Sequence, residues 1–359
     1  MPDIPAHGAN LFDASARTGL PPSAFLDASA SLAPWTPPLA HFTPLHTLRV
    51  YPDPLHSRLK SLLGTIHGLP PDYFLAGNGA SELFTWVARD AASLGKSVLP
   101  APCFADYERA LLCWDSAIER QYLPTDWVGS WPSEYPSPPP SDVLWVCNPH
   151  NPTGQLWSRN SLAALTRRYR LVICDEAFLP LVPNGDDQSL IPYVFNCPNL
   201  IVIRSLTKLF GIAGVRLGYA IAHPDRLARW SHLRDPWPLN GLALRLGERL
   251  LANPRRYRSW CRKVQHWTAV EGSWLFDAFS CLPGLTPKPS AANYMLINSE
   301  YSLLPLKEAL ETRHQILLRD CRSFLGLDEH WLRVGYQSRR RNRRIVKSVR
   351  KEFFHSIFA

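Results

Sequence analysis

Four short apolar runs in the middle of the chain restrict its fold most strongly. They cover residues 143–147, 171–174, 200–203 and 217–221, and each is almost entirely apolar. Strands buried on both faces of a parallel sheet have this composition. Helical periodicity, clearest over 158–169, separates the runs, and this alternation is typical of βαβ units. The pattern predicts an α/β fold with a mostly parallel sheet flanked by helices.

The pattern changes near residue 238, where long helical stretches are followed by isolated strand-like runs. We expect three parts. Residues 1–45 form an N-terminal arm that also contributes to a small domain, residues 46–237 form a large α/β domain, and residues 238–359 form a small α+β domain. A chain of 359 residues is long enough for two domains with their own cores.

Composition excludes several classes of protein. Hydrophobic residues make up 46% and charged residues 19% of the chain, and no apolar run approaches the roughly 20 residues that span a bilayer. The N-terminus lacks the basic and apolar regions of a signal peptide. Eight cysteines are scattered without metal-ligand spacing. We expect a cytoplasmic protein with reduced thiols, no metal and no membrane partner.

A basic run at 339–344 contributes five of the positive charges behind a net charge of +9. Such a run is most often a solvated helix face, and an acidic partner or nucleic acid is the alternative. No stacking motif or nucleic-acid module accompanies it. We therefore expect no nucleic-acid partner, and a small anionic substrate accounts for the basic excess.

Lys208 follows the third apolar run, with small hydroxylated neighbours and three glycines after it. Ser205, Thr207 and Arg216 could together hold a phosphate, which would leave Lys208 as an amine nucleophile. Such a lysine needs nearby cations and partial desolvation to lower its pKa. The alternative interpretation is a surface lysine after a buried strand.

Polar groups follow the other apolar runs. Asn151 lies in a loop with two Asn-Pro steps, at a strand end where α/β sheets bind ligands. Asp175 ends the second run, where it could pair with a protonated pyridine nitrogen or cap a following helix. The backbone amides of Gly79, Ala80 and Ser81 begin a predicted helix, a position that suits a phosphate.

The combination of Asn148-Pro-His-Asn-Pro-Thr-Gly154, Asp175-Glu-Ala-Phe178 and Ser205-Leu-Thr-Lys-Leu-Phe-Gly-Ile-Ala-Gly-Val-Arg-Leu-Gly-Tyr219 resembles the class I and II aminotransferase superfamily, which consists of fold type I pyridoxal-phosphate enzymes. The resemblance implies pyridoxal 5′-phosphate as cofactor. It implies that Lys208 forms the Schiff base, that Asp175 binds the pyridine nitrogen, that Asn151 faces the ring oxygen and that Phe104 stacks on the ring, with Tyr107 beside it as a second aromatic. The phosphate would be held by Ser205, Thr207, Arg216 and the Gly79–Ser81 amides, and by Tyr51 of a neighbouring subunit in a homodimer.

Within that superfamily, the two ends of the chain resemble the threonine-phosphate decarboxylases of the histidinol-phosphate aminotransferase branch. The N-terminal stretch 7–34, which begins His7-Gly-Ala-Asn-Leu-Phe, and the C-terminal stretch 317–336 carry this likeness. It implies that His7, Gly8 and Arg319 bind a substrate phosphate and that Arg333 binds its carboxylate. Ser31 stands where the family tends to have a substrate-contacting asparagine, and Gln337 where it often has another arginine. Phe178 replaces a frequent tyrosine.

Two activities fit these residues. The first is decarboxylation of L-threonine O-3-phosphate to (R)-1-amino-2-propanol O-2-phosphate in cobalamin biosynthesis. The second is transamination of a phosphorylated amino acid such as histidinol phosphate. A non-catalytic relative is a third interpretation, and the presence of both Lys208 and Asp175 weighs against it.

Overall fold

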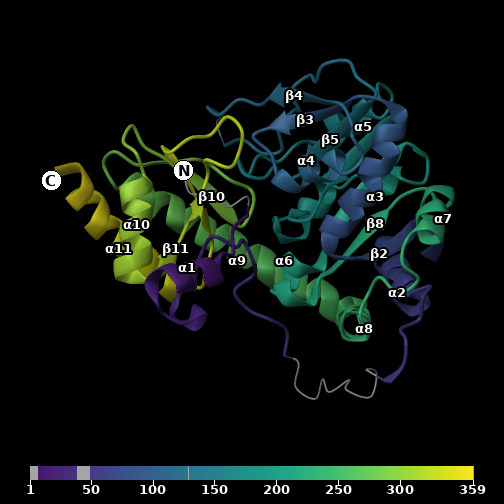
Figure 1. The fold of residues 1–359 in the computed structure, drawn as a ribbon, viewed down its shortest axis with the longest axis horizontal. Helices are drawn as coiled ribbons and strands as arrows, with labels where there is room; N and C mark the ends of the chain where they lie inside the picture. The colour runs from purple at the N-terminus through teal and green to yellow at the C-terminus, as the bar shows by residue number, and fades with distance from the viewer. Residues whose placement is uncertain (1–6, 39–48, 128, 359) are drawn as a thin grey trace.

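The computed structural model describes residues 7–38, 49–127 and 129–358. Two lobes are visible in Figure 1, one built on a large sheet and one carrying the C-terminal helices, with helix α9 (Pro254–Ser280) running beside both. The expected boundary at residues 45–46 lies outside the described residues. The division at 237–238 stays a prediction.

The large lobe is built on a seven-stranded sheet, which confirms the predicted fold class. Six of the seven strands run parallel, and β8 is antiparallel to both of its neighbours. The order across the sheet is β2 (Phe74–Asn78), β8 (Leu217–Ile221), β7 (Leu200–Ser205), β6 (Leu171–Asp175), β5 (Val143–Cys147), β3 (Ser97–Ala101) and β4 (Ile118–Tyr122).

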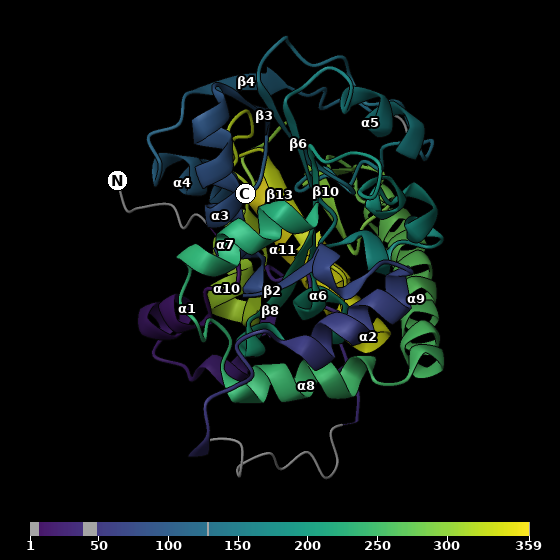
Figure 2. The same cartoon turned by 90° about the vertical axis from the view of Figure 1, so that its right-hand side faces the viewer.

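Helices cover both faces of this sheet (Figures 1 and 2). One face packs against α3 (Gly79–Leu94), α4 (Ala105–Leu112) and α7 (Pro224–Leu233). The other packs against α2 (Ser57–His67), α5 (Arg159–Leu165), α8 (Gly241–Leu251) and α9. Alternate strand residues enter the two layers: Ile173 joins the first core, whereas Val172 and Cys174 join the second. This alternation explains why the buried strands are apolar at every position.

The small lobe contains a four-stranded sheet in the order β12 (Arg319–Asp320), β13 (Trp331–Gly335), β10 (Tyr294–Asn298) and β9 (Thr286–Pro287). Helix α10 (Leu304–His314) packs against α11 (Arg339–Phe358), and α11 packs against α9. The strand-like run at 316–319 is split in the structure. Its first half, β11 (Ile316–Leu317), pairs with β1 (Leu26–Asp27), and its second half pairs with β13.

The N-terminal segment joins the two lobes. Helix α1 (Leu11–Thr18) lies beside α10, where Arg17 Nη2 is 2.6 Å from Glu311 Oε1. After β1, the backbone amide of Ala33 donates to the carbonyl of Lys208 at 3.0 Å. Residues at the start of the chain therefore contact the short helix α6 (Leu206–Phe210) of the large lobe.

The basic run forms the first turns of α11. Arg339 pairs with Glu271 at 3.0 Å, while Arg340, Arg341 and Arg343 are exposed. Within the described part of the chain, no helix is long and apolar enough to cross a membrane.

Candidate active site

The predicted site residues meet where parallel strands end. Asp175 is the last residue of β6, Ser205 is the last residue of β7, and Asn151 lies in the loop after β5. Lys208 follows one turn later, in α6. Because these strands are parallel neighbours, their carboxyl ends share one edge of the sheet, where α/β folds bind ligands.

Asp175 is buried and accepts two hydrogen bonds. Tyr107 Oη donates to its Oδ2 at 2.5 Å, and the amide of Ala177 donates to its Oδ1 at 2.9 Å. Burial raises the pKa of the Asp175 carboxyl to about 6, although both hydrogen bonds and Lys208 act to lower it. A buried carboxylate held in this way suits a cationic ring nitrogen, because a positive partner would favour its ionised form.

Lys208 is set up as a nucleophilic amine. Burial, together with the guanidinium groups of Arg333 and Arg216, lowers the pKa of Lys208 to about 8 against the opposing effect of Asp175. Its Nζ lies 5.3 Å from the centre of the Phe178 ring. An amine with a pKa near neutrality has a substantial unprotonated fraction, which is the form that attacks a carbonyl carbon.

A cradle of backbone amides beside Arg216 lies at the beginning of α3. Gly79 has φ +76°, and a Cβ placed there would lie 2.6 Å from Arg216 Nη2. The amides of Ala80 and Ser81 belong to the first helical turn, where backbone donors have no intrahelical partner. The buried hydroxyl of Thr207 has no hydrogen-bond partner among the described residues. These unsatisfied donors around an arginine fit a phosphate group.

Aromatic rings lie along the site. Phe104 precedes α4 and makes an edge contact with Tyr107, with ring centres 5.7 Å apart. The His7 ring lies 5.4 Å from the Phe104 ring, and His7 Nε2 is 3.7 Å from Asp106 Oδ1. The His7 side chain is 47% exposed, and its partial burial lowers its pKa, with Arg319 and Lys208 contributing to this shift and Asp106 opposing it.

Arg319 and Arg333 form a pair of buried cations. They are direct cross-strand partners in β12 and β13, and only 3% and 7% of their surfaces are exposed. Both guanidinium groups lie near the ring of Phe324, at 5.0 and 5.9 Å. Burial lowers the pKa of Arg319 to about 10, and Arg333 contributes. Like charges directly opposite each other are unfavourable, so bound anions would stabilise this arrangement.

Each arginine also has polar protein contacts. Arg319 Nη2 donates to Ser323 Oγ at 2.5 Å. Arg333 donates to Asn151 Oδ1 through Nη1 and to the carbonyl of Ser29 through Nη2 at 3.2 Å. Arg333 Nε has no partner among the described residues.

A cavity of about 510 Å³ opens beside Arg319, and its wall includes His7, Gly8 and Ser29. Gly8 packs closely on Ser29, because a Cβ there would lie 2.5 Å from the Ser29 carbonyl oxygen. The structure thus brings the predicted phosphate-binding residues of both chain ends to one cavity. A cavity of this volume accommodates a small ligand.

Three further residues that the sequence analysis named lie outside this cavity wall. Ser31 is buried and its hydroxyl is unpaired among the described residues. Tyr51 is 77% exposed and stacks on Trp237, with ring centres 4.3 Å apart. Gln337 donates through Nε2 to the carbonyl of Asp27 at 3.2 Å, which links β1 to the chain before α11.

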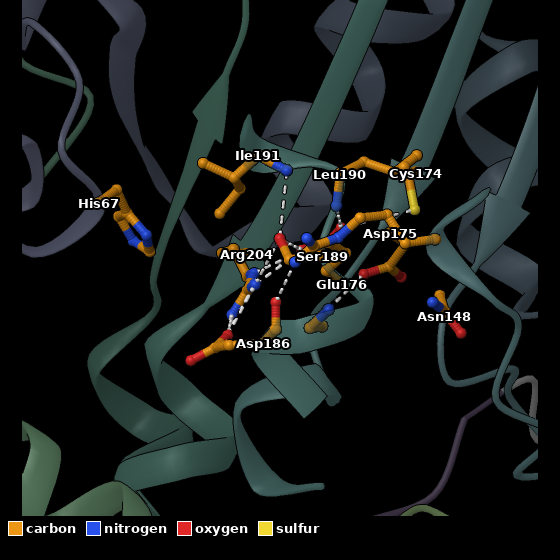
Figure 3. Close-up of polar contacts among 12 residues, drawn as sticks. His67, Asn148, Cys174, Asp175, Glu176, Asp186, Ser189, Leu190, Ile191 and Arg204 are labelled. Atoms are coloured by element: carbon orange, nitrogen blue, oxygen red, sulfur yellow. Dashed lines mark hydrogen bonds and ion pairs between the residues drawn. The ribbon is translucent and has the colours of Figure 1, made fainter. Parts of the chain in front are cut away.

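Sequence reasoning missed several contacts at the site. It placed Tyr107 beside Phe104 as a second aromatic, whereas the structure also pairs the Tyr107 hydroxyl with Asp175. Asp106 accepts from Ser81 Oγ at 2.5 Å and from Arg109 Nε at 2.7 Å. The one sequence feature that could have indicated a role for Asp106 is its position two residues after Phe104. Glu176 and Arg204, drawn in Figure 3, adjoin Asp175 and Ser205 but were given no role.

Among the described residues, no group of three or more His, Cys, Asp or Glu side chains could hold a metal ion. All eight cysteines are unpaired, and burial raises the pKa of the Cys103 and Cys321 thiols to about 12.

Comparison with known proteins places these features in context. The family model described as aminotransferase class I and II matches residues 47–349. A threonine-phosphate decarboxylase of Salmonella typhimurium is 33% identical over 96% of this chain and 96% of its own length. A histidinol-phosphate aminotransferase of Symbiobacterium thermophilum is 31% identical over 84% of this chain and 82% of its own length.

Solved structures share the fold. A histidinol-phosphate aminotransferase of Sinorhizobium meliloti in complex with pyridoxal-5′-phosphate superimposes with a TM-score of 0.82 and covers 99% of this chain and 96% of its own. At 17% identity, this likeness supports the architecture alone.

Proposed function

This chain belongs to the class I and II aminotransferase family, and from that premise we propose that it decarboxylates L-threonine O-3-phosphate with pyridoxal 5′-phosphate as cofactor. The product would be (R)-1-amino-2-propanol O-2-phosphate, used in cobalamin biosynthesis. The family and the decarboxylase relative support the cofactor and the reaction class.

The residues present fit the cofactor. Asp175 suits the pyridine nitrogen, Lys208 the aldehyde carbon, Phe104 the ring face and Asn151 the ring oxygen. Gly79–Ser81, Ser205, Thr207 and Arg216 suit the phosphate, as the unpaired Thr207 hydroxyl and the Gly79–Arg216 approach indicate. When bound, pyridoxal phosphate supplies an electron sink that weakens the bonds to the Cα of an attached amino acid.

The protein groups around the bound cofactor have separate tasks. Asp175, which Tyr107 orients, would stabilise a positive charge on the ring nitrogen of the bound cofactor. Lys208 Nζ, with a pKa of about 8, can hold or release a proton near physiological pH. In the proposed decarboxylation, CO2 leaves from Cα and a proton takes its place, for which the Lys208 amine is a suitable donor.

The observation that carries the substrate assignment is the pair of opposed arginines. A substrate with one phosphate and one carboxylate would neutralise two buried guanidinium groups at once. Arginine binds either anion through two parallel hydrogen bonds. We assign the phosphate to Arg319, His7 and Gly8, which share the 510 Å³ cavity, and the carboxylate to Arg333 beside Asn151. Ser31 lies near the same region, in contact distance of Gly335 in β13.

The decisive experiment offers phosphothreonine to the purified holoenzyme with and without 2-oxoglutarate. Release of CO2 without the oxoacid supports decarboxylation. Glutamate formation that depends on the oxoacid supports the second candidate, transamination of a phosphorylated amino acid such as histidinol phosphate, which the 31% identical relative favours. Unphosphorylated threonine is the matched control, and equal turnover of both compounds would contradict the role of Arg319.

We also infer a homodimer in which Tyr51 reaches the cofactor phosphate of the partner. Its support is the exposed stack of Tyr51 on Trp237, with Val50 and Leu55 exposed nearby in the chain. Mixing Tyr51→Ala and Lys208→Ala subunits tests this arrangement. A mixed dimer contains one site with both Tyr51 and Lys208 intact, so activity should reappear. No recovery of activity in a proven mixed dimer would contradict the role of Tyr51 in the partner's site. A cytoplasmic location belongs to the same proposal, supported by the unpaired cysteines.

A further inference from the structure

A buried ion pair lies directly behind the cofactor-binding strand ends. Arg204 Nη2 is 2.7 Å from Glu176 Oε2, and the side chains are 1% and 0% exposed. Arg204 Nε also donates to the same oxygen at 2.9 Å. Figure 3 shows these groups converging beside Asp175.

Strand geometry connects this pair to the site. Successive side chains of a strand point to opposite faces of the sheet. Asp175 lies toward Tyr107, in the layer of α4, whereas Glu176 points away from it. Arg204 and Ser205 alternate in the same way at the end of β7, and the amide of Glu176 donates to the Ile203 carbonyl at 2.8 Å.

A loop completes the arrangement. Arg204 Nη2 donates to Ser189 Oγ at 3.0 Å and to Asp186 Oδ1 at 3.1 Å. Glu176 accepts from Ser189 Oγ at 2.7 Å and from the amide of Leu190 at 2.7 Å. The ends of β6 and β7 and residues 186–190 are therefore linked through one guanidinium and one carboxylate.

We propose that Glu176 and Arg204 form a clamp on the back of the sheet that positions Asp175 and Ser205 for the cofactor. Neither side chain would touch cofactor or substrate, so both are positioning residues. The inference deepens the proposed function and rests on it for the identity of the cofactor.

Energetics support positioning over simple stabilisation. Burying two charges is costly, and well-packed apolar residues often replace such pairs without loss of stability. The pair also acts on Asp175 through charge, because Glu176 contributes to the raised pKa of Asp175. Burial acts to lower the pKa of Arg204, yet Glu176 and Asp186 raise it above its usual value. Arg204 thus offsets a negative charge next to the ring-binding carboxylate.

The test removes the clamp while leaving no uncompensated buried charge, because Asp186, the other partner of Arg204, has a side chain that is 63% exposed to solvent. The double variant Arg204→Met/Glu176→Gln keeps similar side-chain volumes and retains an acceptor for Ser189. The matched control is Arg226→Met/Asp90→Asn, another largely buried ion pair of the same lobe, which joins α7 to α3. For each, pyridoxal phosphate affinity is measured by tryptophan fluorescence, stability by urea denaturation and the bound cofactor by its absorbance across pH.

We expect the clamp variant to bind pyridoxal phosphate at least about tenfold more weakly, in line with outer-shell residues of metal sites. The pH midpoint of the cofactor absorbance should also shift, since Asp175 is displaced. The control should match the wild type in both readings even if its urea midpoint falls. Equal affinities and midpoints in the two variants would overturn the clamp alone. A wild-type chain that takes up no pyridoxal phosphate would overturn the proposed function as well.

Discussion

Replacing Tyr107 with phenylalanine should change the acid–base behaviour of Asp175 while removing a single oxygen atom. The Tyr107 hydroxyl donates at 2.5 Å to a carboxylate that is otherwise bonded only to the Ala177 amide among the described residues. A hydrogen bond to a charged group contributes about 1.5–3 kcal/mol. Since one pKa unit corresponds to about 1.4 kcal/mol, the pKa of Asp175 should rise by roughly one to two units above about 6.

The stability of the cofactor-free protein reports this shift. The pKa of Asp175 in the folded protein is higher than its ordinary value of 3.8, so its contribution to stability is full below pH 3.8 and is lost as pH rises through about 6. In Tyr107→Phe the loss continues to a higher pH. The destabilisation caused by the substitution should therefore be about 1.5–3 kcal/mol larger at pH 9 than at pH 5.

Urea denaturation at the two pH values measures this difference. Tyr135→Phe is the matched control, because its buried hydroxyl donates to the neutral Gln121 Oε1 at 3.1 Å. That substitution should cost the same at both pH values. If Tyr107→Phe also cost the same at pH 5 and pH 9, the hydroxyl would not stabilise an ionised Asp175, and the reasoning would be refuted.

Three further substitutions test the rest of the site. Gly79→Ala should weaken pyridoxal phosphate binding at least about tenfold, because the new Cβ meets Arg216. Gly68→Ala is the control, since Gly68 has a similar φ of +69° and open space around it, and it should leave the affinity unchanged. Equal effects of the two substitutions would contradict phosphate binding at Gly79. Arg333→Lys keeps the positive charge but loses the planar guanidinium, so kcat/KM for phosphothreonine should fall about tenfold to a hundredfold in steady-state assays. An unchanged kcat/KM would argue against carboxylate binding at Arg333. Lys208→Ala should reduce CO2 release about 10²–10⁴-fold. It should also abolish the covalent cofactor adduct that borohydride reduction fixes, which mass spectrometry detects. An adduct retained in this variant would show that another lysine binds the cofactor.

Strand ends were the most predictable part of the site. Continuous apolar runs identify buried parallel strands, and such strands deliver their next polar residue to a shared edge. Asp175, Asn151 and Lys208 follow from this rule together with the resemblance. The predicted strands at 143–147 and 217–221 agree with β5 and β8 residue for residue.

Other elements lacked such a signal. Strand β4 reads Ile118-Glu-Arg-Gln-Tyr122 and lies at the sheet edge, where polar residues are tolerated. Strand β2 ends in Gly77-Asn78, which indicates a turn from sequence alone. The partners of Asp175 and Arg204 lie 68 residues before Asp175 and 28 residues before Arg204, so only the folded chain brings them together. Hydrophobic periodicity carries no information about such polar pairs.

The contact between Arg333 and Asn151 has a consequence for ligand selectivity. It joins the small lobe to a loop of the large lobe, and the same guanidinium is the proposed carboxylate site. An incoming ligand must therefore compete with an internal amide oxygen for Arg333. A carboxylate displaces the amide oxygen, because it carries the charge opposite to the guanidinium and can accept two parallel hydrogen bonds from it. A phosphorylated amine without a carboxylate, such as the proposed product, cannot compensate for displacing Asn151. The exchange would thus favour product release.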